Sequence, residues 1–236
     1  MPLTFVSLVF TASLVAKLPL VVRTYDAVGL SPGMLEQMQA STNATLAAVG
    51  IRPIWRPCHV AGCVARPKLH EIEIRIVKAT AQSQRDTLGY AAVDVVQRGG
   101  VLGTVFVDRV DALAATSGVD RVELLGRAVA HEIGHLLLGT VEHSPFGLMR
   151  ATWTTAELRR SLPLDWVFSR KQGAEMRRRL SAPAEAAYDT TVDSMSVDRF
   201  SEPLGGEEHY GHDGVGERER PRGREPQDGI VRRPLI

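Results

Sequence analysis

The stretch AVAHEIGHLLLGTVEHSPFGLMRATW, residues 128–153, contains the pattern that decides the fold. Two histidines, His131 and His135, stand four residues apart, with Glu132 directly after the first. Residues four apart on a helix project from the same face, so two imidazoles at this spacing can bind one metal ion. The pattern HExxH therefore predicts a helix that carries a metal site.

The predicted helix has start and stop signals. Asp120 followed three residues later by Glu123 is typical of a helix N-terminus, and Gly139 can end the helix in a left-handed conformation. Apolar residues recur between these signals at helical spacing: Val122, Leu125, Val129, Ile133 and Leu136. We expect a helix over residues 121–138 that is buried on several sides, where unpaired histidines would be costly.

Glu132 gives the motif a chemical purpose. It lies about a quarter turn from His131, so it can face a water on the metal instead of binding the metal itself. Zinc lowers the pKa of such a water to around 7, and a carboxylate beside it can take the proton and pass it to a leaving amine. The pattern predicts one catalytic zinc ion, with Glu132 as the general base of amide hydrolysis.

A catalytic zinc ion usually has three protein ligands. His143 is the natural third candidate, because a turn at Gly139 can bring the following residues back beneath the metal. Two alternatives remain, Glu142 beside it and Glu157 from a later helix. Glu157 also has a structural role available, as the residue that completes a capping box with Thr154.

The rest of the chain alternates strand and helix patterns. Ile72, Ile74 and Ile76 alternate with charged residues, which is a strand period, and two prolines make residues 51–58 a short edge strand. We expect strands at 18–30, 51–58, 69–77, 88–96 and 103–110, and helices at 34–49, 121–138 and after the capping boxes that begin at Thr154 and Ser169.

The chain resembles the metzincin metallopeptidases, whose pattern is HExxHxxGxxH followed by a methionine turn. The matching residues are His131, Glu132, His135, Gly139, His143 and, as the turn methionine, Met149. His143 with Ser144, followed shortly by Leu148 and Met149, is most similar to the matrixin branch. Gly139 lies one position later than in the family pattern and His143 two positions later, so the turn has to absorb two extra residues.

The resemblance implies an α+β fold with a twisted, mostly parallel sheet, an active-site helix, a methionine turn and C-terminal helices. It also implies that residues 88–92 form the sheet edge against which an extended substrate lies, and that Met149 lies beneath the zinc. The expected function is a zinc-dependent metalloendopeptidase that acts on peptide or protein substrates. The alternatives are a metzincin-like domain that binds a peptide or protein without turnover and keeps zinc for stability, and a gluzincin-type peptidase that uses Glu157.

Composition divides the chain into three regions. An apolar run from Leu3 to Ala16 suits a signal-peptide core, although no basic residue precedes it, so residues 1–17 are a candidate leader. A buried first strand and a misassigned start codon are the alternatives. Residues 18–182 form the expected zinc metallopeptidase-like domain, and the polar composition of 183–236 predicts a disordered tail. We expect an exported protein, extracellular or periplasmic, with the cytoplasm as the alternative.

Cysteine usage and charge add two further expectations. Cys58 and Cys63 are the only cysteines, and in an exported chain they would close a small disulfide loop. The formal net charge is +1, with 28 basic and 27 acidic residues. This balance gives no field that would attract nucleic acid or hold the protein on an anionic membrane, so recognition has to come from a local site.

Overall fold

The computed structural model describes residues 16–58, 63, 67–81, 83, 87–96, 98–182 and, for the backbone alone, 230–234. The strands are β1 (Leu18–Asp26), β2 (Ile51–Pro57), β3 (Glu71–Val77), β4 (Gly89–Asp94), β5 (Gly99–Phe106) and β6 (Ile230–Pro234). The helices are α1 (Pro32–Ala47), α2 (Val107–Ser117), α3 (Arg121–Leu138), α4 (Thr155–Arg160), the 3-10 helix η1 (Pro163–Trp166) and α5 (Arg170–Leu180).

The strands form one mostly parallel sheet in the order β2-β1-β3-β5-β4-β6. β1, β2, β3 and β5 are parallel, β4 runs antiparallel to β5, and β6 runs antiparallel to β4. The expected α+β class and mostly parallel sheet are therefore confirmed. β2, which contains Pro53 and Pro57, lies at one edge of the sheet as its sequence predicts.

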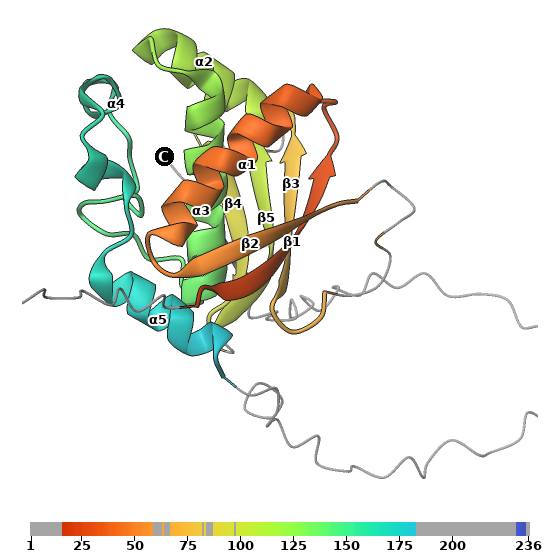
Figure 1. The fold of residues 1–236 in the computed structure, drawn as a ribbon. Helices are drawn as coiled ribbons and strands as arrows, with labels where there is room; N and C mark the ends of the chain where they lie inside the picture. The colour runs from red at the N-terminus through yellow and green to blue at the C-terminus, as the bar shows by residue number, and fades with distance from the viewer. Residues whose placement is uncertain are drawn as a thin grey trace, which may run out of the picture.

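Helices α1 and α3 lie side by side against the sheet (Figure 1). α3 packs on β5 and β4, near one edge of the sheet, and α1 packs on β2 at the other end. Side chains that alternate along the strands fill the space beneath the helices, among them Val22, Ile74 and Val105, all fully buried. This arrangement places the HExxH residues in the middle of the core.

The expected helix boundaries agree well with the structure. α3 spans Arg121–Leu138, and the Asp120 carboxylate accepts from the N–H groups of Val122 and Glu123. The capping boxes at Thr154 and Ser169 are both formed and open α4 and α5. α1 begins slightly earlier than expected, because Ser31 caps it and Pro32 occupies its first turn, where proline is well tolerated.

The expected strand over 103–110 is wrong in its second half, because α2 begins at Val107. The valines suggested a strand, yet Val107, Val110 and Ala114 recur at helical spacing and are all buried. Asp108 lies in the first turn, where a negative charge favours a helix N-terminus. The helix start was hidden because Phe106, at the capping position, makes no side-chain cap.

Both ends of the chain lie largely outside the described residues. The candidate leader is described only from residue 16, and of the predicted disordered tail only β6 is described. That five-residue strand differs from the expectation of a tail without structure. None of the helices that the structure describes is long and apolar enough to cross a membrane.

The expected disulfide is present. Cys58 and Cys63 are bonded to each other, with their Cα atoms 5.6 Å apart. The hydroxyl of Tyr25 in β1 donates to the carbonyl of Cys63 at 3.0 Å. Cys63 is thereby attached to β1.

Two glycines provide a matched test of the packing between α1 and α3. A Cβ at Gly126 would lie 2.8 Å from the carbonyl oxygen of Met38 and 2.6 Å from Cβ of Ser41, whereas a Cβ at Gly33 would meet nothing within 4 Å. We expect Gly126→Ala to lower the free energy of unfolding by about 1–3 kcal/mol, because α1 has to move away. Gly33→Ala should leave it unchanged or raise it by up to about 1 kcal/mol. Urea unfolding of both variants checks this, and equal effects would contradict the packing described.

Candidate metal centre

Three histidines converge at the C-terminal end of α3. His131 and His135 lie one turn apart on that helix, and His143 comes from the loop that follows. One ring nitrogen from each lies within 4.8 Å of the others, and this is the cluster of potential metal ligands found among the described residues. The structure therefore brings together the three ligands expected from the sequence.

Backbone carbonyls fix the two helical histidines. Nδ1 of His131 lies 2.9 Å from the carbonyl oxygen of Leu148, and Nδ1 of His135 lies 2.8 Å from that of Thr140. A carbonyl oxygen can only accept, so each Nδ1 has to carry the proton. Burial lowers the pKa of His131 well below its usual value and that of His135 to about 4. Both rings are therefore neutral, and each Nε2 carries a lone pair.

The two lone pairs face each other. Nε2 of His131 lies 2.9 Å from Nε2 of His135, although with both Nδ1 atoms protonated neither has a hydrogen to share. A cation between them removes this repulsion. Imidazole nitrogens on a tetrahedral zinc ion, each about 2.0–2.1 Å from the metal, lie about 3.3 Å apart. His143, which is only partly buried, has the freedom to close the wider gap. The donor set therefore fits a zinc ion.

The buried side chain of Glu132 is a second unusual feature of this centre, after the facing lone pairs of His131 and His135. The residue is completely buried, and neither carboxylate oxygen has a hydrogen-bond partner among the described residues. Burial raises the pKa of this carboxyl well above its usual value. A buried carboxyl without partners is costly in a core, so Glu132, directly after His131 in α3, lowers the stability of the fold unless a further group completes the site.

Two glycines in the sheet make room for Glu132. A Cβ at Gly89 in β4 would lie 2.7 Å from Oε1 of Glu132, and a Cβ at Gly103 in β5 would lie 3.1 Å from its Cβ. Any larger side chain at Gly89 would also meet the carbonyl oxygen of Thr104 at 2.4 Å. The first residue of β4 and the carboxylate of Glu132 are therefore direct neighbours.

Met149 lies against α3, next to Gly134 of the motif helix. It is fully buried, and its Sδ would lie 2.5 Å from a Cβ at Gly134, with Cε1 of Phe168 at 2.7 Å. The glycine between Glu132 and His135 thus allows the methionine and the phenylalanine to approach the helix closely.

The turn after α3 absorbs the two extra residues of the motif. Gly139 caps the helix in the left-handed conformation, with a φ of 57°. The chain then forms a loop that is closed by a hydrogen bond from the N–H of Ser144 to the carbonyl of Met149, at 2.7 Å. Gln172 of α5 donates to the Ser144 hydroxyl at 2.6 Å. These contacts hold His143 opposite the helical pair.

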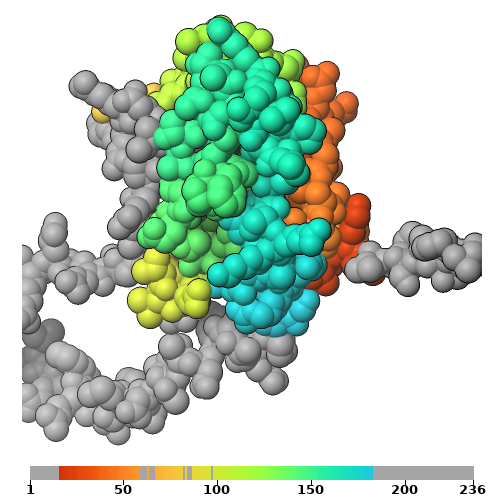
Figure 2. Space-filling model, turned by 90° about the vertical axis from the view of Figure 1, so that its left-hand side faces the viewer, coloured from red at the N-terminus to blue at the C-terminus, as the bar shows by residue number. Residues whose placement is uncertain are grey.

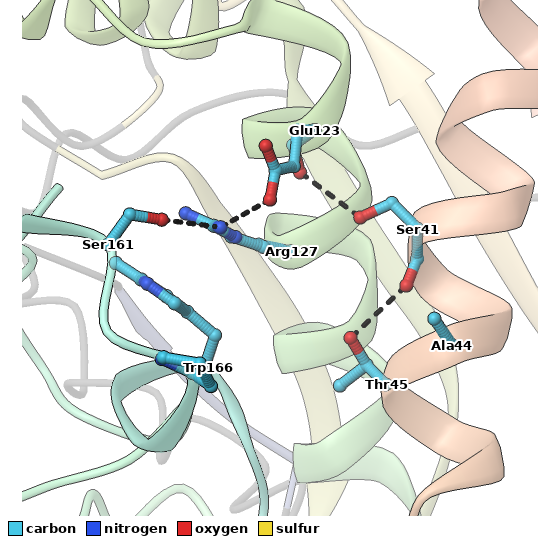
Figure 3. A pocket seen from close by; sticks show the side chains of 8 residues that line it. Ser41, Ala44, Thr45, Glu123, Arg127, Ser161 and Trp166 are labelled. Carbon is cyan, nitrogen blue, oxygen red and sulfur yellow. Dashed lines mark hydrogen bonds and ion pairs between the residues drawn. The ribbon is translucent and has the colours of Figure 1, made fainter. Parts of the chain in front are cut away.

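A set of aromatic and charged side chains supports the carbonyl of Leu148, on which His131 depends. Nε1 of Trp153 donates to this carbonyl at 3.3 Å, and the ring of Trp153 contacts that of Trp166 edge-on, 5.4 Å between centroids. Arg127 stacks on Trp166 at 4.1 Å while it pairs with Glu123 and Ser161 (Figure 3). A pocket of about 470 Å³ beside Arg127, between α1 and η1, is lined by none of the three histidines.

One face of the molecule is formed largely by the chain that follows α3. Figure 2 shows this face: the chain from the end of α3 through α4 and α5 is coloured green to cyan, and the turn between β4 and β5 is yellow at its lower edge. Arg179 of α5 donates to the carbonyl of Arg98 in that turn. A Cβ at Gly139 would clash with the same carbonyl. The turn is therefore packed against the C-terminal end of α3.

The two alternative third ligands lie outside the histidine cluster. Glu157 forms the capping box with Thr154 and an ion pair with Arg150 at 2.5 Å. Hydrogen bonds from Thr154 lower the pKa of Glu157, with Arg150 acting in the same direction. Glu142 is exposed, and neither glutamate belongs to the cluster of potential ligands.

Sequence reasoning missed five residues that pack around the site: Gly89, Gly103, Gly134, Trp153 and Phe168. Gly134 lies inside the motif, and its position between two buried faces of the helix could have indicated a close approach. The other four act across distances in sequence that a local pattern does not show.

No protein-family model and no curated protein matches this chain.

Metal content of purified variants tests the third ligand. We expect His143→Ala to lower bound zinc from one equivalent to well below it, because two imidazoles remain. Glu157→Ala should keep the full equivalent, since Glu157 serves a helix cap, and Glu142→Ala provides an exposed control. Elemental analysis after dialysis measures all three. Full zinc in His143→Ala, with loss in Glu157→Ala, would contradict the assignment.

Proposed function

We propose that this protein is a zinc-dependent metalloendopeptidase of the metzincin type, closest in style to the matrixins. The observation that carries the proposal is Glu132, a buried carboxyl with no hydrogen-bond partner among the described residues, which directly follows one of two imidazoles whose lone pairs face each other. His131, His135 and His143 would hold the ion. A metal that served stability alone would leave the buried Glu132 without a purpose.

When bound, the zinc ion supplies Lewis-acid polarisation of the substrate carbonyl and a water of lowered pKa. Glu132 takes a proton from the attacking water and later donates it to the leaving amine. The raised pKa of its carboxyl suits this exchange, because a stronger base accepts the proton more readily near neutral pH. The hydrogen bonds from His131 to Leu148 and from His135 to Thr140 fix the proton on Nδ1 and orient both rings, while burial keeps the imidazoles neutral by lowering their pKa values.

The substrate would lie along β4. This strand is antiparallel to its neighbour β5, and its first residue, Gly89, contacts Glu132. An extended peptide that pairs with the outer edge of β4 is bound through its backbone, whatever its sequence. Such a peptide passes beside Glu132, which supports cleavage within a chain rather than at its end.

A silent peptide-binding domain with a structural zinc is the alternative, and a conservative substitution separates the two. We expect Glu132→Gln to keep one equivalent of zinc and the wild-type Tm, because the amide has the same shape and removes a buried acid. Its kcat/KM on an unfolded, casein-like substrate should fall by about 10²–10⁴-fold. Glu142→Gln, an exposed change, is the matched control. Hydrolysis that is undiminished in Glu132→Gln and unaffected by chelator would exclude the proposed mechanism.

A further inference from the structure

The outer edge of β4 is occupied by a segment of the same chain. β6 pairs with β4 over the whole of its length, from Asp94 opposite Ile230 to Tyr90 opposite Pro234. In sequence, residues 181–229 separate this strand from α5. The pairing is therefore a long-range contact between the end of the chain and the edge of the sheet.

The occupied edge is the one beside Glu132. Gly89, which precedes Tyr90 in β4, lies against the Glu132 carboxylate. Because the pairing is antiparallel, β6 runs from Asp94 towards this end of β4. It thus lies where the proposed function needs an extended peptide, on the same strand and leading to the same carboxylate.

Only one chain can use this edge at a time. The inner edge of β4 is hydrogen-bonded to β5, so the N–H and C=O groups on the outer edge are the ones available to an added strand. β6 takes them. A peptide that pairs with β4 has to displace β6 first.

The described pairing also ends short of Glu132. Pro234, opposite Tyr90, has no N–H to donate, and proline in sheets is found at edges and strand ends. β6 therefore pairs with residues Tyr90–Asp94 of β4, and Gly89 lies beyond the paired residues. This is the arrangement of a ligand that covers the approach to Glu132.

We propose that Ile230–Pro234 is an intramolecular ligand of the β4 edge, which competes with peptide substrates for it. The expected inhibition rests on the proposed function, whereas the pairing of β6 with β4 does not. A segment that occupies the edge nine-tenths of the time raises the apparent KM about tenfold and leaves kcat unchanged, because a saturating substrate displaces it.

The test uses the full chain with Arg232→Pro and Arg233→Pro together. In a strand, neighbouring N–H groups point to opposite sides, so the double change removes the one directed at β4 whichever residue provides it. Arg232→Ala with Arg233→Ala is the matched control, since it removes the same two charges and keeps both N–H groups. Neither pair belongs to the metal centre.

Two measurements are made on all three proteins: KM and kcat on a quenched peptide, and amide hydrogen exchange of β4. We expect the double-proline variant to show a KM about tenfold lower at unchanged kcat, and faster exchange at those amides of Tyr90–Asp94 that face β6. The double-alanine control should match the wild type in both. A peptide with the sequence of residues 229–236, GIVRRPLI, added to the double-proline variant should restore the higher KM.

Equal KM and equal exchange in the double-proline variant and the wild type would overturn the inference. A lower KM in the double-alanine control as well would also overturn it, because charge and not strand pairing would then be the cause. If none of the proteins hydrolyses peptides, the proposed function fails, and the exchange of β4 still decides whether β6 occupies the edge.

Discussion

Two buried hydrogen bonds determine which ring nitrogens of His131 and His135 are available to a metal ion. The carbonyls of Leu148 and Thr140 oblige His131 and His135 to carry their protons on Nδ1, which leaves two Nε2 lone pairs directed at each other. A buried pair of this kind is unfavourable unless a cation lies between them. The loop that provides the carbonyls is in turn held by Trp153 and by the contact of Ser144 with Gln172. The fold and the histidine cluster therefore depend on the same few contacts.

Glycines in the sheet and in α3 leave the space that the residues of this centre occupy. Gly89 and Gly103 leave the space that Glu132 fills, and Gly134 lets Met149 lie against α3. Because Glu132 is packed onto the first residue of β4, this strand and the Glu132 carboxylate are in contact. The edge is a natural place to bind an extended chain. Pairing with β6 gives that edge a partner from within the protein.

Much of the fold could be predicted from local patterns. The helix of Arg121–Leu138, the edge strand β2, the two capping boxes and the Cys58–Cys63 disulfide depend on spacing and on residues with strong local preferences. The start of α2 could not, because its valines favour a strand and packing on α3 decides the outcome. β6 could not either, since pairing between distant segments leaves no local signal.

The candidate site could be predicted because its potential ligands and Glu132 lie in one short segment of the sequence. HExxH and His143 lie within thirteen residues, 131–143, and the structure brings all three histidines together.

The most direct test of the metal centre is zinc X-ray absorption on the purified protein. We predict a first shell of three imidazole nitrogens at about 2.0–2.1 Å completed by one further oxygen. A shell that contains sulfur, or only two imidazoles, or a protein that binds no zinc, would contradict it.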